Sequence, residues 1–135
     1  MSVIVTDAGF RLAPEEVTAV TLADVAAHQG VLDLAHTDDP EAVAPYLANL
    51  TLIRVSFPAF NDGRAFTVAR RLRMLGYRGE LRATGPVIAD QYAMARRVGF
   101  DAVEIPDELA ARQPEDQWKF RADWRQHDYQ SRLRA

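Results

Sequence analysis

The spacing of hydrophobic positions from residue 31 onward alternates between two patterns. Short apolar runs, typical of strands, alternate with stretches whose apolar residues recur every three or four positions, typical of helices. The predicted strands are 31–35, 52–57, 80–84 and 102–105. The predicted helices are about 38–49, 64–75 and 85–98, with a last helical region from 106. The run at 52–57 is almost entirely apolar, which favours a strand covered on both faces.

A glycine followed by an aromatic residue ends two of the predicted helices. Gly76-Tyr77 and Gly99-Phe100 lie 23 positions apart. Each glycine can adopt the left-handed conformation that closes a helix, and the aromatic residue then packs back on it. Repeated strand–helix units form parallel strands joined by right-handed crossovers. The sequence therefore predicts an α/β fold with a mainly parallel sheet, either half-barrel-like or a small open sheet.

The N-terminal part is less regular. Apolar residues at 3–5 and 17–22 predict two short strands, which could form a hairpin around Ala13-Pro14. Residues 22–28 could instead begin a helix. At its length of 135 residues, the chain is expected to be a single α/β domain over 1–135.

The C-terminal part combines aromatic and charged residues. From about residue 115, the aromatic residues are Trp118, Phe120, Trp124 and Tyr129. Aromatic side chains of this size dominate the surface that they cover. The segment is therefore predicted to be a helical tail that closes the core of the domain, and self-association into a homo-oligomer or partner binding is the alternative.

Composition narrows the classes of function. The chain has no cysteine, and its three histidines lack the spacing of a metal site, so neither a metal nor a cofactor is expected. The apolar runs are too short to cross a membrane, and no signal-peptide pattern is present. A cytoplasmic protein without membrane contact is expected. The net charge of −3 argues against nucleic-acid binding.

Charge is distributed unevenly along the chain. Residues 1–50 carry a net charge of −7 and residues 98–135 carry −2. Residues 51–97 carry +6, from nine arginines and three acids. This arginine-rich middle indicates either a binding site for an anion or internal ion pairing.

Two arginines, Arg54 and Arg82, lie inside predicted strands. A buried arginine costs free energy unless it is paired. Each is therefore expected either to bind a ligand or to form an ion pair. The acids expected as partners are Asp33, Glu80 and Glu104.

The turn between the strand at 52–57 and the following helix contains Asn61, Asp62, Gly63 and Arg64. In α/β folds, ligands bind where strands are followed by helices. Backbone N–H groups at the helix start and the two-pronged guanidinium of Arg64 could hold an anion. The alternative is that Asp62 only caps the helix and Arg64 lies on the surface.

Asp90 and Gln91 lie in the first turns of a later helix. An acid at this position stabilises a helix through its dipole, without any function in binding. Alternatively, the pair could hydrogen-bond to the preceding turn and shape a site. We expect Asp62, Arg64, Arg82 and Asp90 to form one polar cluster.

Several short motifs occur together between residues 51 and 105. They are Phe60-Asn61-Asp62-Gly63-Arg64, Leu72-Arg73, Gly79-Glu80-Leu81-Arg82-Ala83-Thr84-Gly85, Asp90-Gln91 and Gly99-Phe100-Asp101. In this combination the segment resembles a bacterial family catalogued as domain of unknown function 934. Members of that family are typically encoded beside sulfite or nitrite reductase genes and are often labelled oxidoreductases. The resemblance implies a role in assimilatory sulfite reduction.

The residues of the chain qualify that implication. No dinucleotide-binding or phosphate-binding loop is present, and there is no cysteine. We therefore expect an accessory protein of sulfite reduction that binds a small anion or a partner, the candidate partner being a sulfite or nitrite reductase. A small oxidoreductase of sulfur assimilation is the alternative, so enzymatic activity stays open. A structural domain with internally paired arginines is the second alternative.

Overall fold

The structure, a computed structural model, describes residues 2–12, 19–27, 30–58 and 63–122. Its strands are β1 (Ser2–Thr6), β2 (Gly9–Leu12), β3 (Ala19–Thr21), β4 (Gly30–Leu34), β5 (Leu50–Ser56), β6 (Glu80–Thr84) and β7 (Ala102–Pro106). Its α-helices are α1 (Arg64–Met74), α2 (Tyr92–Val98), α3 (Asp107–Arg112) and α4 (Glu115–Arg121). Its 3₁₀ helices are η1 (Leu22–Ala27), η2 (Pro40–Asn49) and η3 (Ala89–Gln91).

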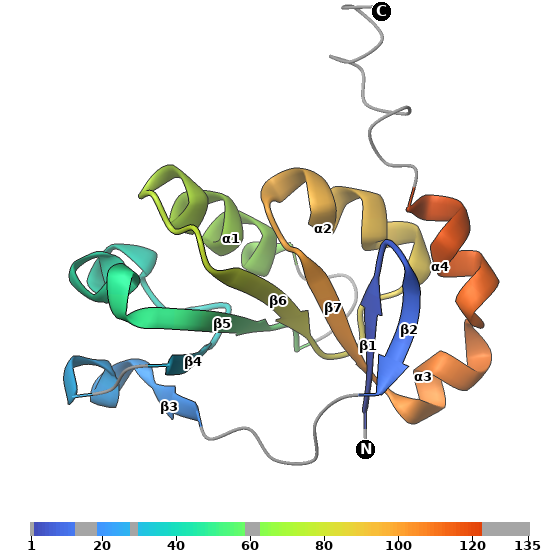
Figure 1. Ribbon diagram of the computed structural model, residues 1–135, viewed down its shortest axis with the longest axis horizontal. Coiled ribbons are helices and arrows are strands. Elements are labelled where there is room, and N and C mark those ends of the chain that lie inside the picture. Colours follow the sequence, from blue (N-terminus) through green and yellow to red (C-terminus); the bar gives the residue numbers. More distant parts are fainter. Residues whose placement is uncertain (1, 13–18, 28–29, 59–62, 123–135) are drawn as a thin grey trace, which may run out of the picture.

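The seven strands form one open sheet in the order β2-β1-β7-β6-β5-β4-β3 (Figure 1). Strands β3 to β7 are parallel to one another, whereas β1 is antiparallel to both β7 and β2. The predicted α/β class with a mainly parallel sheet is confirmed. Of its two predicted forms the open sheet is the one observed, since β2 and β3 are unpaired edges of the described sheet.

The prediction that the strands at 3–5 and 17–22 form a hairpin is wrong. Strand β1 pairs with β2, where Val5 lies opposite Phe10, and its other neighbour is β7. Strand β3 lies at the far edge of the sheet and pairs with β4. Periodicity identifies a strand but not its partner, because pairing depends on which edge of the sheet is available. Residues 22–27 form the helix η1, as the alternative interpretation expected.

The two glycine–aromatic helix ends are confirmed. Gly76 and Gly99 have φ angles of +100° and +117°. The N–H of Tyr77 donates to the carbonyl of Leu72 at 3.1 Å, and the N–H of Phe100 donates to that of Ala95 at 3.0 Å. Both aromatic side chains are buried in the core between the sheet and the helices. The repeated strand–helix unit is thus built the same way twice.

Helices α1 and α2 lie side by side on one face of the sheet (Figure 1). Strands β3 to β7 follow one another in a single direction, so right-handed crossovers place their connecting helices on the same face. In β5, Ile53 and Val55 face this layer and are fully buried, whereas Arg54 and Ser56 face the other side. We call that other side the pocket face.

The expectation that the strand at 52–57 is covered by helices on both faces is wrong for the described part of the chain. The physical reason is the strand order, since a sheet wound in one direction receives its helices on one face only. Among the described residues, polar side chains line a cavity on the pocket face. None of the helices that the structure describes is long and apolar enough to span a membrane.

Candidate functional site

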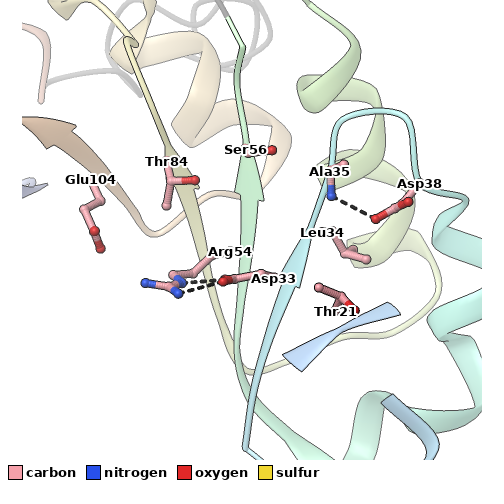
Figure 2. A pocket seen from close by; sticks show the side chains of 9 residues that line it. All are labelled: Thr21, Asp33, Leu34, Ala35, Asp38, Arg54, Ser56, Thr84 and Glu104. Carbon is pink, nitrogen blue, oxygen red and sulfur yellow. Dashed lines mark hydrogen bonds and ion pairs between the residues drawn. The ribbon is translucent and has the colours of Figure 1, made fainter. Parts of the chain in front are cut away.

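A cavity of about 390 Å³ lies on the pocket face, at the carboxyl ends of strands β3 to β7. We call it the strand-end pocket (Figure 2). It is lined by Thr21, Asp33, Leu34, Ala35, Asp38, Arg54, Ser56, Thr84 and Glu104. Each of these five parallel strands contributes at least one residue. Ligands of open α/β sheets bind at this edge, so the location matches the expectation for a site.

The register of the sheet brings these side chains together. Asp33 lies opposite Arg54, and Arg54 lies opposite Arg82. Two residues closer to the carboxyl ends of the strands, Thr84 lies between Ser56 and Glu104. Because side chains alternate between the faces of a sheet with period two, both rows point to the pocket face. Two polar rows thus cross the sheet beneath the pocket.

Arg54 and Asp33 form a two-pronged ion pair in the pocket. The Nε and Nη2 atoms of Arg54 donate to the two carboxylate oxygens of Asp33 at 2.6 and 2.8 Å. This hydrogen bonding raises the pKa of Arg54 above its ordinary value, and the charge of Glu104 adds to the effect. In Figure 2 the remaining nitrogen, Nη1, points away from Asp33. Among the described residues Nη1 has no hydrogen-bond partner, so the pair leaves one charged donor available.

Arg82 is buried beside the pocket, with only 5% of its surface exposed. It donates to Glu80 at 2.6 Å and to Glu104 at 3.1 Å. Ser2 donates to the other oxygen of Glu104 at 3.0 Å. Within the described residues no acceptor reaches the Nε atom of Arg82. Both strand arginines are therefore paired with the acids expected for them, and Arg82 acts on the pocket by holding Glu104.

Carboxylates outnumber arginines in the lining of the pocket. Asp33, Asp38 and Glu104 face a single guanidinium, that of Arg54. Asp38 also accepts the backbone N–H of Ala35 at 2.9 Å, which fixes its orientation. Across the residues that the structure describes, no group of three histidine or acidic side chains could hold a metal ion. The pocket therefore offers more hydrogen-bond acceptors than charged donors.

Arg64 contributes to a different cavity. It is exposed at the start of α1, directly after Gly63, and α1 has no side-chain N-cap. A cleft of about 500 Å³, here called the α1 cleft, lies between α1 and the segment after β4. It is lined by His36, Thr37, Pro40, Arg64, Thr67, Val68 and Arg71. Arg71 is bonded to Glu41, which offsets part of the positive charge.

The other predicted site residues do not gather around Arg82. Gln91 accepts the N–H of Ile88 at 3.1 Å and so helps to start its own helix, and Asp90 is exposed in the same turn. Arg82 forms no hydrogen bond or ion pair with Arg64 or Asp90 in the described part of the chain. It therefore does not connect the polar cluster that the sequence predicted.

Two members of the predicted turn, Asn61 and Asp62, lie outside the described residues. Their part in a site stays a prediction. The described end of the turn, Gly63 and Arg64, does join the carboxyl end of β5 to the start of α1, as expected.

Several of the shared motif residues meet far from the pocket, around Arg73. Its guanidinium donates to the carbonyl oxygens of Gly99, Tyr77 and Gly79, each at 2.9 Å, and to the carboxylate of Asp101 at 2.8 Å. Asp101 in turn accepts the backbone N–H at the start of β6 at 2.9 Å. We call this arrangement the Arg73 clamp. These motif residues hold the fold together at the amino ends of β6 and β7.

Six polar residues of the pocket were not predicted as site residues. Asp33 and Glu104 were expected only as ion-pair partners of the strand arginines, and the other four are Thr21, Asp38, Ser56 and Thr84. The sequence does contain a signal for Ser56 and Thr84. Polar residues occupy alternate positions in the strands, at 54 and 56 and at 80, 82 and 84. This period of two marks one polar face shared by adjacent strands. Thr21 and Asp38 carry no such signal, because only the strand order brings them to the pocket.

Comparison with known proteins gives one match. A family model described as a bacterial protein of unknown function, DUF934, matches residues 30–135. No curated protein and no solved structure matched. The matched range includes every residue of the strand-end pocket except Thr21.

Proposed function

We propose a function for this chain, which belongs to the DUF934 family of bacterial proteins: it is an accessory protein of sulfite reduction that binds a small polar ligand in the strand-end pocket. One observation carries the binding proposal. Side chains from five adjacent parallel strands converge on a single cavity at the carboxyl edge of the sheet. The context of sulfite reduction rests on the family resemblance of the motifs between residues 51 and 105.

The shape and chemistry of the pocket support ligand binding. Its volume of about 390 Å³ falls in the range of small-molecule sites. The ion pair between Arg54 and Asp33 holds both side chains in place, so a ligand would meet an ordered surface. The hydroxyl groups of Ser56 and Thr84 add groups that can either donate or accept.

An accessory role fits the sequence better than a self-contained oxidoreductase. The chain has no cysteine and no dinucleotide-binding loop. An accessory protein could instead carry a ligand to a reductase or bind the surface of one. The proposed partner is a sulfite or nitrite reductase.

Anion binding in the α1 cleft is the second candidate function. The cleft is lined by the cationic side chains of Arg64 and Arg71 and by His36, and Arg71 is bonded to Glu41. Guanidinium groups bind oxyanions through pairs of parallel hydrogen bonds. Sulfite and sulfate are the anions that the family resemblance points to.

The remaining alternative is a purely structural domain. The pairing of Arg54 with Asp33, and of Arg82 with Glu80 and Glu104, favours it. In that case neither cavity would bind a small molecule, and the chain would not bind a reductase. The three alternatives therefore differ in what the chain binds.

Titration of the isotope-labelled full chain, followed by the shifts of its backbone amide resonances, tests these alternatives. The chain is titrated with a purified sulfite reductase and, separately, with sodium sulfite. The accessory role predicts shifts with the reductase, and their absence both with and without sulfite would contradict it. Sulfite shifts at Thr67 and Arg71 would support the second candidate. Arg64→Gln should then remove them, whereas Arg70→Gln, on the exposed side of α1, should not.

A further inference from the structure

The strand-end pocket carries a surplus of negative charge. Asp33, Asp38 and Glu104 line it together with Arg54. Just outside the lining, Arg82 and Glu80 are paired, and Arg11 lies 3.6 Å from Glu80. These neighbours add two positive charges and one negative charge, so four acids face three arginines. An incoming oxyanion would meet this excess charge, whereas a ligand that carries a cationic group would offset it.

The carboxylates keep unused acceptor capacity. An ionised carboxylate has about four lone-pair sites. Glu104 uses two of them, one for Ser2 and one for Arg82. Its side chain is only 16% exposed, so water satisfies the remaining sites incompletely. A protonated amine, which has three donors, matches these acceptors in both charge and hydrogen bonding.

The pocket also contains one charged donor. The Nη1 atom of Arg54 has no partner among the described residues, because Asp33 engages only Nε and Nη2. The arginine side chain is 17% exposed, and the charge of Glu104 contributes to the raised pKa of Arg54. Arg54 and Glu104 therefore line the same pocket from β5 and β7, and no hydrogen bond joins them in the described part of the chain.

We propose that the strand-end pocket binds a free α-amino acid in its zwitterionic form. The ammonium group donates to Glu104, and the carboxylate accepts from the Nη1 atom of Arg54. Both charged groups of an α-amino acid are attached to one carbon, so they can reach a donor and an acceptor that face each other in a small cavity. Thr84 lies on β6, between the strands that carry these two anchors, and Ser56 lies on β5, two residues after Arg54. This inference rests on the proposed ligand-binding function of the pocket and names its ligand class.

A screen of the twenty common L-amino acids tests the proposal on the full chain. Thermal shift identifies binders, and amide shifts of the isotope-labelled chain locate them. At least one amino acid should shift the resonances of Ser56, Thr84 and Glu104. Its N-acetyl and carboxamide derivatives should each bind at least about tenfold more weakly, because each loses one charge-assisted hydrogen bond. This comparison requires no variant of the protein.

Variants provide a second measurement. Glu104→Gln and Arg54→Lys should each weaken binding of the identified amino acid by about tenfold or more, and the control Arg70→Gln should leave it unchanged. Circular dichroism checks that each variant is folded. If a variant does not fold, the comparison of the amino acid with its N-acetyl and carboxamide derivatives on the unmodified chain still tests the proposal. Equal affinity for the derivatives, or no amino-acid binding, would overturn the proposal. Pocket shifts with sodium sulfite or glycerol alone would refute the amino-acid class and leave the pocket as a ligand site. If none of these probes shifts the pocket resonances, the result would count against both the amino-acid ligand and the proposed ligand-binding function of the pocket.

Discussion

Single residues shape the strand-end pocket through the backbone as well as through their side chains. Gly85 directly follows the pocket residue Thr84 and has a φ angle of +118°. A Cβ atom at this position would lie 2.4 Å from the carbonyl oxygen of Phe57. The N–H of Phe57 donates to the carbonyl of Thr84 at 2.8 Å. The absence of a side chain at Gly85 therefore allows the ends of β5 and β6 to approach each other below the pocket.

Replacing Gly85 with alanine should destabilise the protein more than the same change at Gly76. Gly76 also has a positive φ, +100°, but a Cβ there would meet nothing within 4 Å. Gly76→Ala should cost about 1 kcal/mol, from the backbone conformation alone. Gly85→Ala adds a clash with a backbone oxygen and should cost about 2–4 kcal/mol in total. Urea unfolding of both variants measures the difference, and equal losses would show that the ends of β5 and β6 can move apart freely.

Elements are joined by side chains that reach across several of them. The Arg73 clamp connects α1 to the turns that precede β6 and β7. The guanidinium also lies over the ring of Tyr77, 5.5 Å from its centre, which places it against the aromatic residue that ends α1. One side chain thus binds three backbone carbonyls in the turns that follow α1 and α2.

Removing the Arg73 side chain should loosen this edge of the sheet. Arg73→Ala removes hydrogen bonds to three carbonyls and to Asp101, and it should lower the free energy of unfolding by about 2–3 kcal/mol. Arg70 lies about one turn away on the exposed side of α1, so Arg70→Ala should change the free energy of unfolding by less than about 0.5 kcal/mol. Urea denaturation compares the two. A small effect of Arg73→Ala would mean that water replaces the clamp without loss.

At the scale of the whole molecule, Tyr92 connects the C-terminal helix α4 to the turn between β1 and β2. Trp118 of α4 is buried, meets Tyr92 edge to face at 6.1 Å and donates to the carbonyl of Gln113 at 2.8 Å. The hydroxyl of Tyr92 donates to Asp7, in the turn between β1 and β2, at 2.5 Å. Burial first, and then this hydrogen bond, raise the pKa of Tyr92, so the hydroxyl stays a neutral donor. The core-closing role predicted for the aromatic tail is thus performed by Trp118.

Phe120, the next aromatic residue of the predicted tail, does not share this role. Phe120 is 73% exposed, and Trp124 and Tyr129 lie outside the described residues. Trp118→Ala should therefore lower the free energy of unfolding by about 3–5 kcal/mol, whereas Phe120→Ala should change it by less than about 0.5 kcal/mol. Thermal or urea unfolding of the two variants measures this. A larger loss at Phe120 would show that its side chain is covered in solution, for instance by a second copy of the chain.

Much of the fold could be predicted from the sequence because the responsible interactions are local. Gly76 and Gly99 end their helices through residues only a few positions away, and the strand at 80–84 has the predicted bounds. The acids that pair with Arg54 and Arg82 were also predicted, since a buried guanidinium requires a carboxylate. These conclusions depend on short-range geometry and on the cost of burying charge.

The strand-end pocket was decided only by the tertiary structure. Thr21, Asp38 and Glu104 are far apart in the sequence, and they meet because the sheet is wound in one direction with all its crossovers on one face. The sequence alone predicted most of the strands and helices of this protein, although not β2, and the acids that pair with its two strand arginines. Strand order and register decided where β1 and β3 lie, which face of the sheet the described helices cover, and which residues line the cavity. The physical reason is that pairing between distant strands depends on which edges and faces are available once the rest of the chain has packed.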